Sequence, residues 1–452
     1  MLFQKQIANL TASILPKISD KQFISMIRFA EKTVIPKKYL FAVRNIRLSL
    51  TRKEPYAQVL RKVFNLDKNY RKKMTSWVFD TFLNKMKKWG YHEDKGDFQV
   101  PKAILMSPTM RCNLSCKGCY AGKYSVDEDL NFNTVDRIIN EGKKMGVFFF
   151  VFIGGEPFAW PHLLKTCAKH NDCMFLIFTN GTLISERTTK IMKKLGNMIP
   201  AISIEGFEKE TDERRGKNVY KRIHYTMSML NQNKIPFGYS VTVMKKNANL
   251  VMSERFVDMM IDKGALMGWY FLYMPVGKNP DMNEMPTPLQ RLQLLKQGKL
   301  IRQTKPLFFI DFWNDSPYAP GCIAGKYYLH ITNKGDVEPC IYSHVAQDNI
   351  KNKSLKEVLQ SPFFRELRRR QPFNKNLFLP CMWIDNPKVS RELYEKFKLY
   401  PTHEGADFIL KNKVARKKID KYAEEMEELY RDEWESFKKK KAERIKLRKE
   451  LK

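Results

Sequence analysis

The first hundred residues carry apolar positions with the period of a helix. Four apolar side chains spaced i, i+4, i+7 and i+11 share one helical face: Phe23, Ile27, Ala30 and Val34. Lys and Arg stand between this group and the later apolar clusters of the segment. We therefore predict a basic helical N-terminal region over residues 1–100. The polar segment 93–97 predicts a linker near its end.

After Pro101 the pattern changes to short apolar runs that alternate with segments of helical period. Six runs predict strands, at 102–107, 147–153, 174–179, 199–204, 238–244 and 268–274. Five segments between them predict helices, at 133–145, 162–170, 185–195, 217–232 and 250–263. Parallel strands need such crossover helices, so the alternation indicates an α/β fold. We predict a partial, open six-stranded parallel (βα) barrel over 101–275, with its site at the carboxyl ends of the strands.

The remainder of the chain predicts smaller units. Prolines at 280, 286 and 288 predict a linker or lid over 276–317, with a helix near 290–303. Gly335-Asp336, between two β-type runs, predicts a hairpin inside a small α+β module over 318–405. Residues 406–452 are highly charged and predict a C-terminal helix with one apolar stripe: Ile419, Tyr422, Met426, Leu429 and Tyr430.

Charge changes this picture. The chain has 81 Lys and Arg against 48 Asp and Glu, a net charge of +33. Such an excess favours anionic partners, although lysines spread along a chain are equally a solvated surface. The N-terminus lacks the apolar core of a signal peptide, and no apolar run reaches the roughly 18 residues of a membrane span. We expect a cytoplasmic protein whose basic helices offer peripheral contact with the anionic inner face of a membrane.

Three cysteines at the spacing CxxxCxxC follow the first predicted strand: Cys112, Cys116 and Cys119. Three thiolates so close in sequence can hold one soft metal centre. A 4Fe–4S cluster usually takes four thiolates, so three would leave one iron open to a small molecule. Zinc prefers a closed set of four N or S ligands and fits less well unless a distant ligand completes it. A trio of buried thiols is the third interpretation.

Polar motifs stand at the ends of later strands. Gly154-Gly155-Glu156-Pro157 follows the second strand, where the glycines permit close backbone approach and Glu156 can accept from an ammonium group. Thr179-Asn180-Gly181, a turn signal, follows the third strand. Ser203 and Glu205 lie on one side of the fourth strand, and a hydroxyl with a carboxylate suits a ribose diol.

The cysteine triplet, with Gly-Gly-Glu-Pro 35 residues beyond it, resembles the cluster loop of the radical S-adenosylmethionine (SAM) superfamily. The resemblance implies a 4Fe–4S cluster held by Cys112, Cys116 and Cys119, with SAM bound at the open iron. It further implies that SAM is reductively cleaved to a 5′-deoxyadenosyl radical, which abstracts hydrogen from a substrate. Such an enzyme needs a reducing partner such as ferredoxin or flavodoxin.

The same resemblance implies which residues contact SAM. The motif at 154–157 would bind the amino group of its methionyl part. The other implied contacts are Tyr120, Asn180, Ser203, Glu205 and Ser240. The family more often has Asp where this chain has Glu205. Packing explains Tyr120 equally well, and on the fifth strand Thr242, on the same side as Ser240, is also simply a good strand former.

A second cysteine set follows the barrel: Cys322, Cys340 and Cys381. It resembles the auxiliary-cluster module called SPASM, or its shorter twitch form. The full module has seven cysteines and this chain has three here, so at most one auxiliary iron–sulfur cluster is implied. Its fourth ligand would be Asp385, His403, substrate or solvent. The alternative is a hairpin subdomain with three inert thiols.

The substrate stays open between two classes. A peptide or protein side chain is typical of relatives with an auxiliary cluster. A membrane lipid is suggested by the basic arm and by aromatic residues near the barrel mouth: Trp269, Tyr270, Phe271 and Tyr273. A different class altogether is a non-catalytic metal-binding protein associated with nucleic acid, with structural cysteine sites. Strand-end motifs argue against it, and we expect no specific nucleic-acid partner.

Overall fold

The computed structural model describes residues 12–450 except 34, 36 and 80–97. Val34 and the predicted linker 93–97 lie outside the described residues. The described strands form one ten-stranded sheet, in the order β11-β9-β8-β1-β2-β3-β4-β5-β6-β7, and a separate two-stranded one. The predicted strands are six neighbouring strands of it, in chain order: β1 (Ala103–Met106), β2 (Phe149–Phe152), β3 (Met174–Thr179), β4 (Met198–Ser203), β5 (Gly238–Val243) and β6 (Met267–Leu272).

All pairings among these six strands are parallel. The crossover helices are α7 (Phe132–Met145), α8 (Leu163–Lys169), α9 (Glu186–Leu195), α10 (Glu208–Arg215), α11 (Val219–Gln232), α12 (Ala248–Val251) and α13 (Glu254–Asp262). Asn131 caps the first of them by accepting from the Thr134 amide, and Gly146 ends it at φ 96°. The α/β class and the open barrel are thus confirmed.

Helix α10 was not predicted. Its sequence EKETDERR has no apolar stripe, so periodicity could not reveal it. A capping arrangement in which the Glu210 carboxylate accepts from the Phe207 amide fixes its start instead. This short helix brings two arginines to the end of β4.

Four more strands extend the sheet beyond the predicted six, and two of them pair in parallel with it. β7 (Phe308–Asp311) pairs with β6, and β8 (Tyr328–Ile331) pairs with β1, both in parallel. The predicted hairpin is confirmed: β8 pairs antiparallel with β9 (Asp336–Glu338). The C-terminal module is therefore continuous with the barrel sheet. Sequence periodicity cannot show this pairing, because β1 and β8 are far apart in the chain.

The other C-terminal elements are short, up to the final helices. They are η3 (Met282–Glu284), α14 (Pro288–Thr304), η4 (Ser316–Tyr318), β10 (Val345–Ala346), β11 (Asp348–Asn349), α15 (Leu355–Leu359), α16 (Pro362–Arg369), α17 (Pro387–Lys396), β12 (Tyr400–Pro401), α18 (Phe408–Lys411), α19 (Lys413–Leu429) and α20 (Arg431–Glu450). The predicted stripe of the tail packs: Met426 and Tyr430 are fully buried against Leu292, Leu295 and Phe378.

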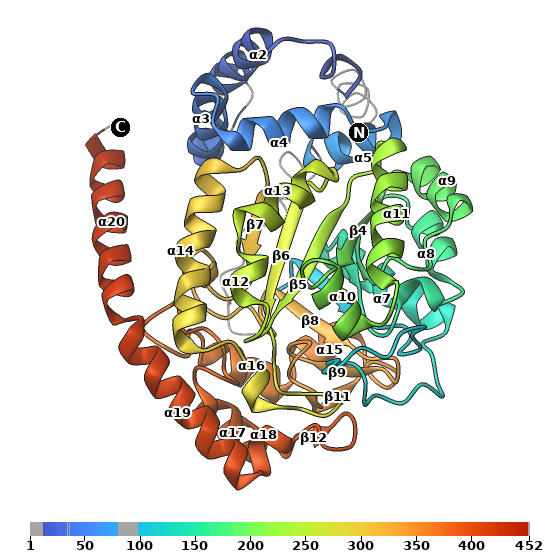
Figure 1. Cartoon of the computed structure of the whole chain (residues 1–452), viewed down its shortest axis with the longest axis vertical. Helices are drawn as coiled ribbons and strands as arrows, with labels where there is room; N and C mark the ends of the chain where they lie inside the picture. The colour runs from blue at the N-terminus through green and yellow to red at the C-terminus, as the bar shows by residue number, and fades with distance from the viewer. Residues whose placement is uncertain (1–11, 34, 36, 80–97, 451–452) are drawn as a thin grey trace.

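Four N-terminal helices cover the amino ends of the strands: α2 (Asp20–Thr33), α3 (Lys37–Thr51), α4 (Pro55–Phe64) and α5 (Lys68–Phe79). Figure 1 places them at the end of the barrel opposite the C-terminal module. The buried Tyr70 hydroxyl donates to the carbonyl of Met198, the first residue of β4, at 2.7 Å. The Asn69 amide donates to the Lys193 carbonyl at 3.0 Å. The carboxyl ends of the strands lie at the other end of the barrel.

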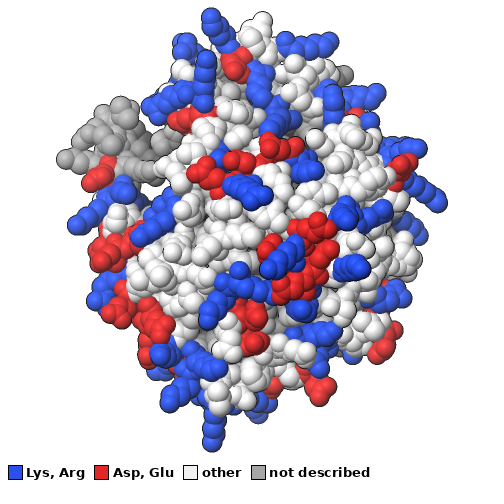
Figure 2. Space-filling model, viewed as in Figure 1, with Lys and Arg blue, Asp and Glu red and all other residues white. Residues whose placement is uncertain are grey.

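Charged side chains are dispersed. Figure 2 shows Lys and Arg over the whole visible face, with Asp and Glu among them. Of the described helices, none is long and apolar enough to cross a bilayer.

We expect Tyr70→Phe to lower the free energy of unfolding by about 1–3 kcal/mol, because the buried Met198 carbonyl loses its donor. Denaturant unfolding measures the change. Tyr225→Phe, at a side chain that is 50% exposed, is the matched control and should change stability by less than about 0.5 kcal/mol. Equal effects in both variants would contradict the anchoring role of Tyr70.

Candidate active site

The cysteine triplet lies on the loop that leaves the carboxyl end of β1. Cys112 is exposed, and Cys116 and Cys119 are half-buried. The Leu114 amide donates to the Cys112 sulfur at 3.4 Å, and the Asn180 side-chain amide donates to it at 3.7 Å. Thiolates that bind iron are stabilised by such donors. The loop thus presents its three thiols beside the end of β3.

Within the described residues, no three Cys, His, Asp or Glu side chains converge closely enough to hold a single metal ion. A zinc ion needs four ligands at about 2.0–2.3 Å from one centre. The thiolates of a 4Fe–4S cluster bind different irons and stand further apart. The all-sulfur donor set and its spread along one loop fit a cluster.

Gly154 and Gly155 are required by contact with the cysteine loop. A Cβ atom on Gly155 would stand 2.3 Å from the Met110 carbonyl oxygen and 2.4 Å from that of Arg111. Gly154 has a φ of 116°, in the region that favours glycine. The Glu156 amide donates to the Arg111 carbonyl at 2.8 Å. The close approach predicted for these glycines is therefore made, first of all, to the loop's own backbone.

The Glu156 carboxylate is buried and accepts three hydrogen bonds. Its Oε1 accepts from the Thr179 hydroxyl at 2.7 Å and the Phe158 amide at 3.0 Å, and its Oε2 accepts from the Asn180 amide at 2.7 Å. Burial raises the pKa of Glu156, and these donors oppose that rise. Asn180 in turn donates to Asn113 at 2.9 Å. Glu156 therefore joins the ends of β2 and β3 to the cysteine loop and keeps capacity for a further donor.

A second buried carboxylate, that of Glu205, lies just beyond β4 and is bound by two arginines. Its Oε1 accepts from Arg214 at 2.5 Å and from Arg215 at 2.5 and 2.9 Å. Its Oε2 is buried, and no donor among the described residues reaches it. A buried carboxylate oxygen without a donor is rare in a folded protein. It is therefore available to a hydroxyl or ammonium group of a ligand.

Arg214 and Arg215 were not predicted as site residues. An Arg215 nitrogen lies 4.0 Å from the Cys116 sulfur, and the Lys117 amide donates to the Arg214 carbonyl at 2.9 Å. Burial opposes the charge of Arg215, but the nearby Glu205 and thiol groups raise its pKa. The only sequence signal that could have identified these two residues is the pair of adjacent arginines after the acidic residues of α10. The arginine pair brings positive charge to the cysteine loop, whose thiolates would carry negative charge as iron ligands.

Ser203 and Ser240 face each other on neighbouring strands. They are direct register partners of β4 and β5, and both are partly exposed. Trp269 of β6 is the next register partner along the same row. These side chains point into the barrel, because the alternate residues Tyr239 and Tyr270 pack outward on the helix layer. The two serines expected to contact SAM therefore lie side by side, which the sequence alone did not predict.

The start of the predicted lid covers the cysteine loop. The Lys278 amide donates to the Cys119 carbonyl at 3.0 Å, and the Lys278 ammonium donates to the Ser115 hydroxyl at 2.8 Å. Gly277, at φ 80°, lies so close to the loop that a Cβ would stand 2.2 Å from the Tyr120 carbonyl oxygen. Tyr120 turns its hydroxyl to the Gly154 amide, which donates to it at 3.4 Å.

Four rings form an aromatic wall inside the barrel: Phe178, Trp269, Phe271 and Phe312. Their centroids are 5.1–6.0 Å apart along the series. Of the four aromatic residues predicted at the mouth, only Trp269 and Phe271 belong to it. Tyr270 is buried on the outer face of the sheet, because side chains alternate along β6. Tyr273 packs over Gly118 of the cysteine loop.

The second cysteine set lies where the C-terminal module meets the wall. Burial raises the pKa of Cys322 to about 12 and that of Cys340 to about 11. Both thiols also act on the pKa of Cys381, so the three share one neighbourhood. The Tyr328 hydroxyl donates to the Cys340 sulfur at 3.0 Å. The Tyr328 ring lies 6.2 Å from Phe312 and so links this set to the aromatic wall.

Both residues named as fourth ligands of this set have other partners. Asp385 forms a fully buried ion pair with Arg291 of α14, at 2.5 and 3.0 Å, and accepts from the Cys381 amide at 2.9 Å. His403 pairs with His344 at 2.8 Å. The Trp383 indole N–H, two residues from Cys381, is buried and has no acceptor among the described residues. The ion pair with Arg291 disfavours Asp385 as a ligand. The Trp383 indole N–H would be available to donate to a sulfur atom of a cluster.

The comparisons with known proteins agree with this geometry. The family model "Radical SAM superfamily" matches residues 106–257, and "Iron-sulfur cluster-binding domain" (SPASM) matches residues 322–382. The chain belongs to the radical SAM superfamily and carries a SPASM domain. It is therefore an enzyme with SAM and a 4Fe–4S cluster as cofactors, and the SPASM match implies auxiliary iron–sulfur binding.

Two of the relatives with sequence similarity come from archaea. The chain is 24% identical over 305 residues to the AdoMet-dependent heme synthase of Methanosarcina barkeri, covering 60% of this chain and 85% of the relative. It is 30% identical over 210 residues to the uncharacterized protein MJ0907 of Methanocaldococcus jannaschii, covering 42% and 71%. Streptococcus suis SuiB bound to its precursor peptide SuiA has the same fold, with a TM-score of 0.53, 19% identity and coverage of 68% and 73%.

We expect Tyr328→Phe to lower the reduction potential of an auxiliary cluster by roughly 40–90 mV, the one-electron equivalent of a hydrogen bond of about 1–2 kcal/mol. The donor stabilises the more negative, reduced form, so its loss disfavours reduction. Redox titration followed by EPR measures the shift. Tyr318→Phe, at a side chain 69% exposed, is the control. An unchanged potential in Tyr328→Phe would contradict Cys340 as a ligand that accepts this bond.

Arg291→Met should lower the free energy of unfolding by about 3–5 kcal/mol, because it leaves the Asp385 carboxylate buried and unpaired. The double variant Arg291→Met/Asp385→Leu should recover most of that loss and keep the iron of the second cysteine set. Denaturant unfolding and iron analysis check both statements. If Asp385 were a ligand, the double variant would lose iron as Cys340→Ala does.

Proposed function

We propose that Cys112, Cys116 and Cys119 hold the 4Fe–4S cluster at which this enzyme cleaves SAM. The observation that carries the proposal is the bonding of the cysteine loop to the ends of β2 and β3 through Glu156 and Asn180. When bound, the cluster supplies the electron that splits SAM into methionine and a 5′-deoxyadenosyl radical. The remaining chemistry falls to groups that bind, orient and shield SAM and the substrate.

The SAM contacts follow from the polar groups that face this loop. Backbone groups of Gly154–Pro157 and the remaining capacity of Glu156 take the amino group. The unpartnered Oε2 of Glu205 accepts from a ribose hydroxyl, and Ser203 and Ser240 line the same side. Tyr120 orders the cysteine loop, because its hydroxyl accepts a hydrogen bond from the Gly154 amide.

The C-terminal module has a separate task. We propose that Cys322, Cys340 and Cys381 bind one auxiliary cluster, with substrate or solvent as the fourth ligand. In this division 1–100 is an arm, 101–275 the SAM barrel, 276–317 the lid, 318–405 the auxiliary module and 406–452 the helical tail. A low-potential one-electron donor such as ferredoxin or flavodoxin supplies the electrons.

We propose that the substrate presents an apolar or aromatic group of a peptide or protein to the wall of Phe178, Trp269, Phe271 and Phe312. The wall reaches the second cysteine set through Tyr328, its Phe178 is two residues from Asn180, which donates to Cys112, and SuiB, of the same fold, binds a peptide. A flat macrocycle is the second candidate, since a relative is a heme synthase and the wall is built of rings. A lipid delivered by the N-terminal arm is disfavoured, because the arm lies at the opposite end of the barrel.

The decisive test uses anaerobically purified protein, reconstituted with iron and sulfide and given SAM and dithionite. Wild type should bind about eight irons if both sites hold 4Fe–4S clusters and should release 5′-deoxyadenosine. Cys116→Ala should lose about four irons and all SAM cleavage, whereas Cys340→Ala should lose only the second set of irons. Cys167→Ala, at a buried cysteine outside both sets, is the control. Zinc in place of iron, or cleavage retained by Cys116→Ala, would refute the proposal.

A further inference from the structure

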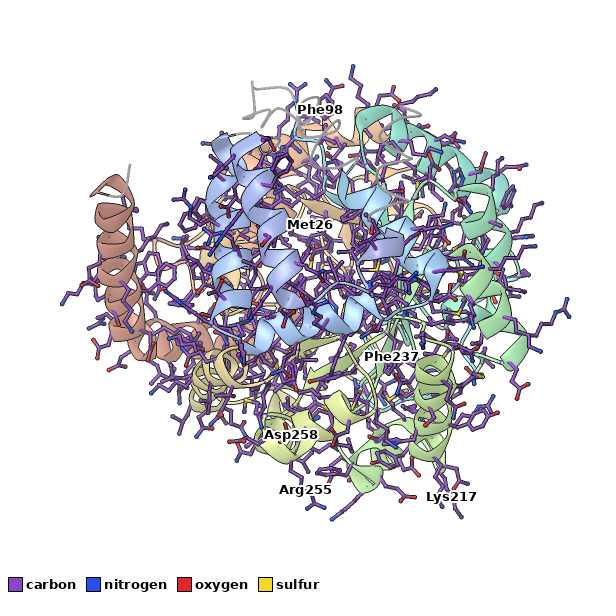
Figure 3. All side chains as sticks on the ribbon, turned by 90° about the horizontal axis from the view of Figure 1, so that it is seen from above. Met26, Phe98, Lys217, Phe237, Arg255 and Asp258 are labelled. Atoms are coloured by element: carbon purple, nitrogen blue, oxygen red, sulfur yellow. The ribbon has the colours of Figure 1, made fainter. Side chains whose placement is uncertain are left out.

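Helices α2 and α3 expose large apolar side chains at the amino end of the barrel. Phe29 is 67% exposed and Met26 is 41% exposed, both on α2. Figure 3 looks onto this end of the molecule, where the two helices face the viewer and Met26 lies on them. Apolar side chains grouped at a surface mark contact with a partner or a membrane. The inner face of α2 is already used, since Ile27 packs against Leu50 and Ala57.

A basic stripe runs beside these two residues. Lys21, Arg28 and Lys32 are exposed and spaced i, i+7 and i+11, so they line up on α2 next to Phe29. Acidic groups do not neutralise them: Glu31 pairs with Arg47 at 3.0 Å and Asp20 pairs with Arg61. Within the described part of the chain, none of the three bases has a carboxylate partner. The face is at once apolar and positively charged.

We propose that this face of α2, with α3 beside it, docks the enzyme on an anionic lipid bilayer. Phe29 and Met26 enter the boundary between headgroups and acyl chains, and Lys21, Arg28 and Lys32 contact lipid phosphates. Both components are needed for stable binding by a helix that lies in the membrane plane. A polyanion such as a nucleic acid would engage the bases but would leave the two apolar side chains in water.

Docking here sets the orientation of the enzyme. The arm is fixed to the amino ends of the strands through Tyr70 and Asn69, whereas the cysteine loops lie at the carboxyl ends. The barrel mouth therefore faces away from the bilayer. The membrane is a place of attachment, and the substrate enters from the aqueous side.

The test is co-sedimentation of the full-length reconstituted protein with vesicles. Wild type should bind vesicles of phosphatidylcholine with about a third phosphatidylglycerol at low salt, and should bind pure phosphatidylcholine far less. Lys21→Glu/Arg28→Glu/Lys32→Glu should weaken binding at least about tenfold, and Met26→Ser/Phe29→Ser should weaken it several-fold. Lys413→Glu/Arg416→Glu/Lys417→Glu on α19, with the same charge change at the other end of the molecule, should stay within about twofold of wild type.

Three results would overturn the proposal. The first is absence of wild-type binding to anionic vesicles at low salt. The second is equal weakening by the α2 and α19 charge variants, which would indicate attraction by net charge alone. The third is unchanged binding of Met26→Ser/Phe29→Ser, which would indicate a polyanion surface without insertion. All substituted side chains face solvent, and thermal unfolding of each variant verifies that the fold is kept.

Discussion

The structure depends on the pairing of β1 on both of its edges. β2 lies along one edge and β8 along the other, so the loop that leaves β1 emerges between the barrel and the C-terminal module. All four residues of β1, Ala-Ile-Leu-Met, are apolar, and Ile104 and Met106 are fully buried, as expected of a strand inside a parallel sheet. This position brings the cysteine triplet within reach of Gly154 and Gly155 on one side. It brings the β8–β9 hairpin, which is flanked by Cys322 and Cys340 of the second cysteine set, to the other.

Two buried carboxylates then organise the charges around the loop. Glu156 is surrounded by neutral donors, which hold it at the ends of β2 and β3. Glu205 is surrounded by Arg214 and Arg215, which leave one oxygen free and bring positive charge toward Cys116. A cluster of iron and thiolates and the sulfonium of SAM carry opposite charges. In the proposed site, the arginine pair would offer a counter-charge to the first, and the Glu156 carboxylate, stabilised in its buried position by three neutral donors, would offer one to the second.

The sequence was sufficient for the central sheet and the cofactor loops, because their signals are local. Each apolar run, each Gly-containing turn motif and the spacing of the cysteine triplet is complete within about ten residues of sequence. The sequence was insufficient where contacts are long-range: the parallel pairing of β8 with β1 and the Arg291–Asp385 pair. Helix α10 was missed because a solvent-facing helix of charged residues has no apolar period. The arginines it carries were missed with it.

The Arg291–Asp385 pair also joins the two ends of the active-site half of the molecule. Gly277 and Lys278 cover the loop of Cys119, and α14, the next long helix, is bound by Asp385, 94 residues after Arg291 in the chain. Asp385 also accepts from the amide of Cys381, a member of the second cysteine set. One buried ion pair therefore couples the cover of the first cysteine set to the backbone of the second, and losing either partner loosens both.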